Sequence, residues 1–110
     1  MSVYTPDHWV IVKLEGENVP DGILYKVLAG WYGGYLGSDS WKLNSGITKI
    51  VDKGDHYAID GYSGSRYLCF KDAERLGSYT ASIFKDLATE LEGEATMKIV
   101  PVTSILDMFK

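Results

Sequence analysis

Short apolar segments, separated by turn signals about every ten residues, dominate this chain. The best-defined turn is N-V-P-D-G at Asn18–Gly22, where Pro20 presets the backbone angle φ and Gly22 can adopt a positive one. It separates two runs rich in strand-forming residues, His8–Leu14 and Ile23–Gly30. We therefore predict that these two runs form an antiparallel hairpin.

Further segments continue this pattern along the chain. They are predicted strands at Trp41–Leu43, Ile47–Val51, His56–Asp60, Arg66–Lys71 and Thr96–Val100. The turns D-K-G-D and G-Y-S-G-S separate the middle ones, and Pro101 suits an edge position for the last because proline cannot donate a hydrogen bond to a sheet. Antiparallel strands this short favour a meander that curls.

The periodicity changes in Y-T-A-S-I-F-K-D-L-A-T-E-L, Tyr79–Leu91, where apolar residues recur at helical spacing. These apolar residues are Ile83, Phe84, Leu87, Ala88 and Leu91. Gly93 follows, at a point where helices often need a left-handed residue. We predict one α+β domain over residues 1–110, with a curled, meander-like antiparallel β-sheet of five to seven strands and one main α-helix packed on a face.

Composition disfavours several classes of protein. The net charge is -4 and no basic cluster is present, so nucleic acid is not expected as a partner. Cys69 is the single cysteine and lies in a predicted strand, where we interpret it as a buried small hydrophobe. No leader peptide or long apolar run is visible. We expect a cytoplasmic protein without a membrane partner.

Motifs for catalysis or cofactor binding are missing from the sequence. Gly61–Ser65 lacks the last glycine of a hydrolase nucleophile elbow and lies between two strands. Gly30, Gly33, Gly34 and Gly37 match neither a dinucleotide nor a phosphate loop. The two histidines and the cysteine lack zinc-ligand spacing. We therefore predict neither a metal nor a cofactor.

One enzymatic alternative stays open. His56 lies between Asp55 and Asp60 in the sequence, and a carboxylate can orient an imidazole for acid–base work. Neighbours on a strand point to opposite faces, so we expect Asp55 and His56 not to touch. The alternative is therefore a small enzyme that uses His56 with Asp60 or Cys69.

The segment A-G-W-Y-G-G-Y-L-G-S-D-S-W-K-L-N-S-G at 29–46 is the main candidate for recognition. Large aromatic residues flank a hydroxyl-rich S-D-S, a combination common on binding surfaces. The same residues could instead belong to the core, with glycines serving the bends. A second turn with a tyrosine and a serine is a candidate neighbour. The predicted binding residues are Trp31, Tyr32, Tyr35, Ser38, Asp39, Ser40, Trp41, Tyr62 and Ser63.

Three stretches, at Asp7–Lys13, Tyr25–Ile47 and Ser63–Lys71, resemble a set of small proteins encoded by large contractile-tailed bacteriophages, including phages of cyanobacteria. G-W-Y-G-G-Y-L-G-S-D-S-W-K is the most specific part of this resemblance. No catalytic residues are assigned in that set. The resemblance therefore implies a context, namely a phage accessory protein in the host cytoplasm.

Three functions follow as hypotheses. The first is a non-enzymatic binding protein that captures a host protein or a small anionic metabolite through the aromatic, glycine- and serine-rich loop. The second is the small enzyme described above. The third is a structural or assembly protein, in which the amphipathic tail Ser104–Phe109 either folds back on the body or docks on another chain. Docking would give a homodimer through Ile105, Leu106, Met108 and Phe109.

Overall fold

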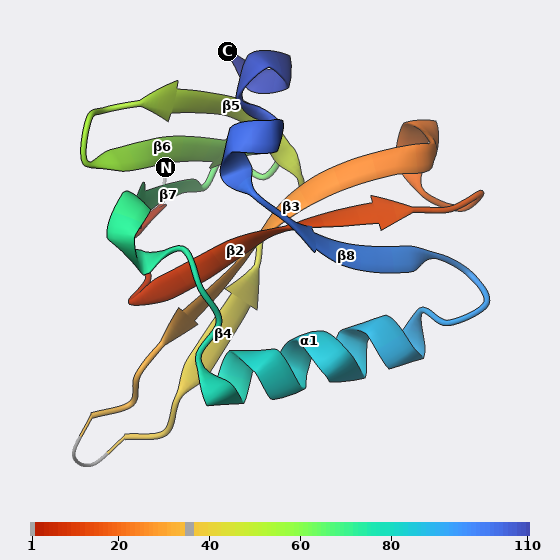
Figure 1. Ribbon diagram of the computed structural model, residues 1–110, viewed down its shortest axis with the longest axis horizontal. Helices are drawn as coiled ribbons and strands as arrows, with labels where there is room; N and C mark the ends of the chain where they lie inside the picture. The colour runs from red at the N-terminus through yellow and green to blue at the C-terminus, as the bar shows by residue number, and fades with distance from the viewer. Residues whose placement is uncertain (1, 35–36) are drawn as a thin grey trace.

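The structure is a computed structural model that describes residues 2–34 and 37–110 (Figure 1). Its regular elements are β1 (Val3–Tyr4), β2 (His8–Glu15), β3 (Ile23–Trp31), β4 (Ser40–Leu43), β5 (Ile47–Asp52), β6 (His56–Gly61), β7 (Arg66–Phe70), α1 (Ser78–Glu90) and β8 (Thr96–Val100). Short 3-10 helices lie at Pro20–Gly22, Lys71–Ala73, Val102–Ser104 and Leu106–Phe109. This confirms the α+β class with one main helix.

The strands form two sheets, each with two antiparallel neighbours at its centre. We call the sheet with the order β1-β7-β6-β5 the β6 sheet, and the sheet with the order β4-β3-β2-β8 the β3 sheet. The predicted hairpin is present as β2 and β3, and β8 is an edge strand as expected from Pro101. The meander thus divides into two packed sheets instead of curling as one.

The division occurs at the corner between β4 and β5. Asn44 is buried there, its backbone N–H donates to the carbonyl of Val27 at 3.0 Å, and its Oδ1 accepts from the Val27 N–H at 2.8 Å. Gly46 then adopts a φ of 137°, which a residue with a side chain rarely does. These contacts end β4 and direct the chain into the second sheet.

The two sheets enclose the larger core, and α1 covers the other face of the β3 sheet (Figure 1). On β2, Trp9 and Ile11 point between the sheets, while Val10 and Val12 point toward the helix. Both faces of β2 are therefore buried. This explains why its sequence is a continuous apolar run rather than an alternating one.

The C-terminal tail folds back on the body, which is the first of the two alternatives. Ile105 is 1% exposed and belongs to the core between the sheets. The ring of Phe109 lies edge-on to Tyr25 at 5.8 Å between centroids. Of the four apolar tail residues only Met108 is exposed.

Among the described residues, none of the helices is long and apolar enough to cross a membrane.

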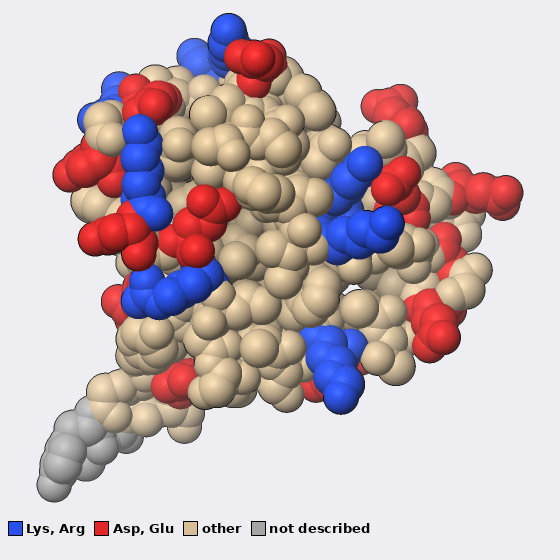
Figure 2. All heavy atoms as spheres, viewed as in Figure 1, with Lys and Arg blue, Asp and Glu red and all other residues tan. Residues whose placement is uncertain are grey.

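Figure 2 shows how charge is distributed on one side of the molecule. Acidic and basic side chains lie interleaved over the end that carries β5, β6 and β7, and uncharged surface separates them from a second group near the β2–β3 turn. On this side, no large area carries positive charge alone.

Candidate binding groove between two sheet edges

Trp31 ends β3 and lies at the boundary between the two sheets. Its indole Nε1–H donates to the carbonyl of Thr5 at 3.0 Å, and its ring lies edge-on to Tyr4 at 6.2 Å. It packs against the core between the sheets but stays half-buried. Trp31 therefore connects the end of β3 to Thr5, which directly follows β1.

Tyr32 and Trp41 belong to the helix side of the same sheet. The Tyr32 N–H donates to Asp7 Oδ2 at 2.8 Å, and its ring lies 4.9 Å from the His8 ring. Trp41 is opposite Gly30 on β3 and packs, half-buried, against the cluster under α1. The predicted aromatic group is thus divided between two faces, because successive strand residues alternate. Tyr35 lies outside the described residues.

Gly33, Gly37 and Asp39 hold together the two arms of the loop between β3 and β4. Asp39 Oδ1 accepts a hydrogen bond from the Gly33 N–H at 2.9 Å. A Cβ on Gly37 would lie 2.2 Å from the Gly33 carbonyl oxygen, so the two arms approach too closely for any other residue. Ser38 and Ser40 are exposed on the returning arm. Much of the unusual composition therefore serves loop closure.

A hollow of about 460 Å³ lies beside Trp31, between β1 and β4. Its lining residues, which we call the β1–β4 groove, are Val3, Tyr4, Thr5, Trp31, Ser40, Trp41 and Lys42. The Lys42 ammonium lies 5.0 Å from the centre of the Tyr4 ring, within the range of a cation–π contact. The groove thus brings together three predicted residues, Trp31, Ser40 and Trp41.

Sequence reasoning missed the other side of this groove. β1 contains only two residues and has no detectable periodicity, and it pairs with β7 more than sixty residues away, Val3 opposite Arg66 and Tyr4 opposite Tyr67. Lys42 was visible as a charge next to Trp41, but nothing in the sequence placed Tyr4 beside it. Only the pairing of β1 with β7 brings the two together.

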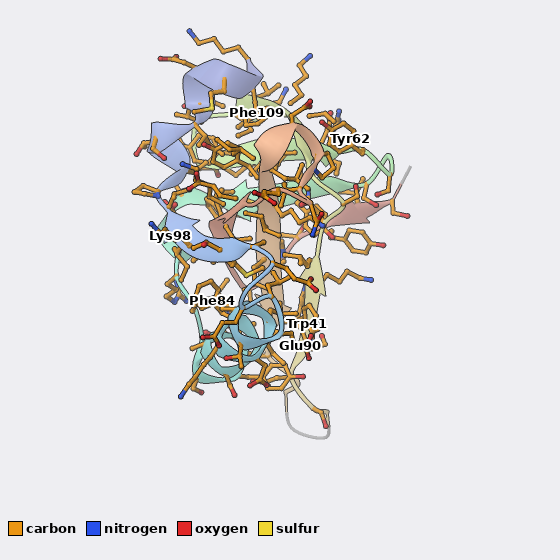
Figure 3. All side chains as sticks on the ribbon, turned by 90° about the vertical axis from the view of Figure 1, so that its right-hand side faces the viewer. Trp41, Tyr62, Phe84, Glu90, Lys98 and Phe109 are labelled. Atoms are coloured by element: carbon orange, nitrogen blue, oxygen red, sulfur yellow. The ribbon has the colours of Figure 1, made fainter. Side chains whose placement is uncertain are left out.

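The turn that carries Tyr62 and Ser63 does not join the groove. A Cβ on Gly46 would lie 2.8 Å from the Tyr62 ring, and Tyr62 shares a hollow with Leu24 and Phe109 at the start of β3. The Ser63 N–H donates to Ser45 Oγ at 2.9 Å. Trp31 is seven residues further along β3, about 23 Å away. Figure 3 shows Tyr62 and Phe109 near one end of the molecule and Trp41 toward the other.

His56 contacts Asp55, and the prediction that they would not touch is wrong. His56 Nδ1 lies 2.7 Å from Asp55 Oδ1. The alternation rule does not apply, because Asp55 belongs to the turn before β6 and only His56 is in the strand. The His56 ring also lies 5.0 Å from Phe70 on the outer face of the β6 sheet. This face is open to solvent at Asp55, which is 76% exposed in its side chain.

The structure does not bring His56 together with Asp60 or Cys69. Asp60 accepts two hydrogen bonds from Arg66, at 2.6 and 3.1 Å, and the Arg66 guanidinium lowers the pKa of that carboxyl. Cys69 is opposite Tyr57, hence on the inner face, where it is fully buried and burial raises the pKa of its thiol. Within residues 2–34 and 37–110, no three potential metal ligands of the His, Cys, Asp or Glu type cluster together.

Two other hollows lie near the β2–β3 turn. One, of about 470 Å³, is lined by small or polar residues and by the acidic Glu15, Glu17 and Glu94. The other, of about 240 Å³, has aliphatic walls from residues such as Leu14 and Leu91, with Lys26 beside them. Neither contains an aromatic side chain. The β1–β4 groove, by comparison, combines aromatic rings, a hydroxyl and a cation.

Comparisons with protein-family models, curated proteins and solved structures found no match to this chain. The functional interpretation therefore depends on the geometry of the groove.

Proposed function

We propose that this chain is a non-enzymatic binding protein whose binding surface is the β1–β4 groove. The observation that carries the proposal is the convergence of Tyr4, Trp31, Trp41, Ser40 and Lys42 on one hollow of about 460 Å³. Binding sites of this size combine apolar walls with a few polar groups that orient the ligand. The candidate ligands are a host protein and a small anionic metabolite.

The lining favours an anionic ligand with apolar or planar parts. Lys42 is the one Lys or Arg among the described lining residues, and it is exposed. Aromatic walls offer area at a low cost in side-chain entropy, since Trp and Tyr each have two side-chain torsions to fix. The hydrogen bond from Trp31 to Thr5 keeps this wall in position before a ligand arrives.

A pair of charge-reversed variants tests this function. Wild-type protein, Lys42→Glu and Lys98→Glu are each immobilised and exposed to bacterial lysate, and the captured proteins and small molecules are identified by mass spectrometry. Lys98 is the control because it is exposed on β8, the other edge of the same sheet (Figure 3). We expect a species held by wild type and Lys98→Glu to be missing with Lys42→Glu. Capture that is equal in all three, or absent in all three, contradicts the proposal.

A further inference from the structure

We infer that the β1–β4 groove binds an extended segment of another protein by strand addition, with an acidic side chain of that segment against Lys42. This inference rests on the proposed binding function and specifies its partner. Three features support it: the outer edges of β4 and β1, each without a further strand among residues 2–34 and 37–110, and the charge between them.

The first feature is the outer edge of β4. Within the described part of the chain, β4 pairs with β3 alone. The Asn44 N–H donates to Val27 on β3. In an antiparallel pair, every second residue directs its main-chain N–H and C=O toward the partner strand. Lys42 and Ser40 therefore direct these groups toward β3. The N–H and C=O groups of Trp41 and Leu43 consequently point to the open edge. They form a template for another strand.

The second feature is the outer edge of β1. Arg66 N–H donates to the carbonyl of Ser2 at 2.8 Å, so Ser2 faces β7. The main-chain N–H and C=O of the next residue, Val3, therefore point away from β7. Those of Thr5 do so as well, and the Thr5 carbonyl accepts a hydrogen bond from the Trp31 indole instead. Val3 is 54% exposed and lines the groove.

The groove lies between these two edges and not on one face of a strand. Three consecutive residues line it on each side, namely Val3 and Tyr4 of β1 with the following Thr5, and Ser40–Lys42 of β4. Side chains of consecutive strand residues point to opposite faces, so a hollow in contact with all three must lie at the strand edge. An extended chain placed there meets main-chain donors and acceptors, which a compact metabolite would leave to water.

The third feature is charge, which selects the occupant. Lys42 is the one base among the described residues that line the groove, and it matches an acidic side chain. A lysine on an edge strand also opposes pairing between two copies, because self-pairing of a four-residue strand brings the two ammonium groups close together. The occupant is therefore an acidic, extended segment of a different protein rather than a second copy.

Displayed random linear peptides of twelve residues are the probe. Selection on the immobilised wild-type protein, after removal of peptides that bind Lys42→Glu, should enrich sequences in which Asp or Glu alternates with β-branched or aromatic residues. Affinity of the best peptide is then measured by tryptophan fluorescence. We expect Lys42→Glu to weaken binding at least about tenfold, which corresponds to about 1.4 kcal/mol, and Lys98→Glu to leave it unchanged.

Methylation of the peptide backbone tests the strand pairing itself. Synthetic copies of the best peptide carry one N-methyl group each, moved along the chain position by position. Strand addition predicts an alternating pattern, with about tenfold loss at every second residue and little change between, since N–H groups of a strand point alternately to either side. Recognition by side chains alone predicts no such alternation.

Val3→Pro and Val3→Ala provide the matched test on the protein. Proline removes the N–H that faces the groove and leaves the bonds to β7, whereas alanine keeps the N–H and removes most of the side chain. We expect weaker binding for Val3→Pro alone, with melting curves that show both variants folded. If Val3→Pro does not fold, the N-methylation scan of the peptide alone tests whether the peptide pairs as a strand.

Strand addition is overturned if no peptide is enriched, if the enriched peptides are basic, or if methylation has no alternating effect. When these results accompany a lysate ligand that Lys42→Glu fails to capture, the binding function stands and the extended partner is rejected. When the lysate experiment also gives no ligand that depends on Lys42, both proposals fail.

Discussion

The two faces of the β3 sheet are both buried, yet they are packed in different ways. The face toward the β6 sheet carries Trp9, Ile11, Val27 and Ala29, and all four are fully buried. The face toward α1 carries Val10, Val12 and Leu28, but the helix residues above them, such as Phe84, are only partly buried. The first face is filled mainly by large apolar side chains. The second leaves its covering helix partly in water.

The helix face also contains a buried polar pair. His8 Nε2 lies 2.7 Å from Thr80 Oγ1, and both residues are at most 1% exposed. Thr80 Oγ1 also accepts from the Gly77 N–H at 3.0 Å and lies 3.2 Å from the Gly77 carbonyl. We assign the Nε2–H tautomer to His8, because His8 then donates to Thr80 and Thr80 donates to Gly77. In the described structure, the acceptor His8 Nδ1 stays without a partner, as does the buried Asn44 Nδ2 at the corner between the sheets.

The β6 sheet and α1 are thus attached to the two faces of the β3 sheet in different ways. Between the sheets, large side chains fill the space, and stability depends on volume. Under α1, a specific hydrogen bond joins His8 at the start of β2 to Thr80 in the first turn of the helix. We therefore expect stability to depend also on the protonation of His8. Variants on the two faces should therefore lose stability to different extents, with the largest loss expected between the sheets.

Removal of an aromatic ring should cost more between the sheets than under the helix. Trp9 is fully buried, and its indole N–H donates to the carbonyl of Phe70 at 2.8 Å. We expect Trp9→Ala to lower the free energy of unfolding by about 3–5 kcal/mol. Phe84→Ala should cost about half as much, because its ring is already partly in water. Urea denaturation measures both, and equal losses would contradict the comparison.

A methyl group added at Gly30 should destabilise the helix face. A Cβ there would lie 2.2 Å from His8 Nε2 and 2.5 Å from Thr80 Cγ2, and both side chains are buried. We expect Gly30→Ala to cost about 2–3 kcal/mol. The same substitution in a His8→Ala background should cost clearly less, since the obstructing ring is gone. If the cost is the same in both backgrounds, the ring does not occupy this space.

Loss of the Thr80 hydroxyl should lower the free energy of unfolding by about 1–2 kcal/mol. Thr80→Val keeps the shape but leaves the His8 N–H and the Gly77 N–H without an acceptor. Thr80→Ser retains the hydroxyl and serves as the control, and it should lose less. Thermal melts of both variants at pH 7.5 provide the measurement. A greater loss for serine than for valine would show that packing and not hydrogen bonding dominates at Thr80.

The smallest effect is a pH dependence that belongs to the helix face. Burial lowers the pKa of His8 from 6.5, with Arg75 acting in the same direction and Asp7 and Asp39 opposing it. Below about pH 6.5 the unfolded chain therefore binds more protons than the folded one, so stability falls as pH falls. The slope cannot exceed about 1.4 kcal/mol per pH unit for one group.

His8→Gln isolates this contribution. It cannot titrate, and both proteins keep His56, so the difference between their stabilities from pH 7.5 to 5.0 reports on His8. We expect the wild type to lose stability relative to His8→Gln over this range. Parallel curves would mean that the pair is as insensitive to protonation as the inter-sheet core.

Local sequence patterns predicted most elements because they depend on residues a few positions apart. The apolar run of β2, the turn at Pro20 and Gly22 and the spacing of Phe84, Leu87 and Leu91 each determine one strand, turn or helix. The helix of the structure, Ser78–Glu90, differs from the predicted one by a single residue at each end. Gly93 has the positive φ, 89°, that was expected of it.

The candidate site was only partly predictable. Trp31, Ser40 and Trp41 were expected to bind a ligand and do line the groove, whereas Tyr62 and Ser63 were grouped with them on composition and lie at the other end of β3. Tyr4 and Val3 gave no signal, because a strand of two residues has no period to detect. Their place depends on a pairing with Arg66 and Tyr67.

By itself, the sequence determined the α+β class, the β2–β3 hairpin, the single main helix and the lack of a recognisable catalytic motif. The tertiary structure alone decided that the strands divide into two sheets, that Trp31 and Tyr32 serve different faces, and that β1 meets β4 across a groove. The physical reason is the distance along the chain over which the deciding interactions act. Strand and helix preferences arise within a few residues, but the meeting of two sheet edges follows from how whole sheets pack, and that depends on contacts between residues far apart in the chain.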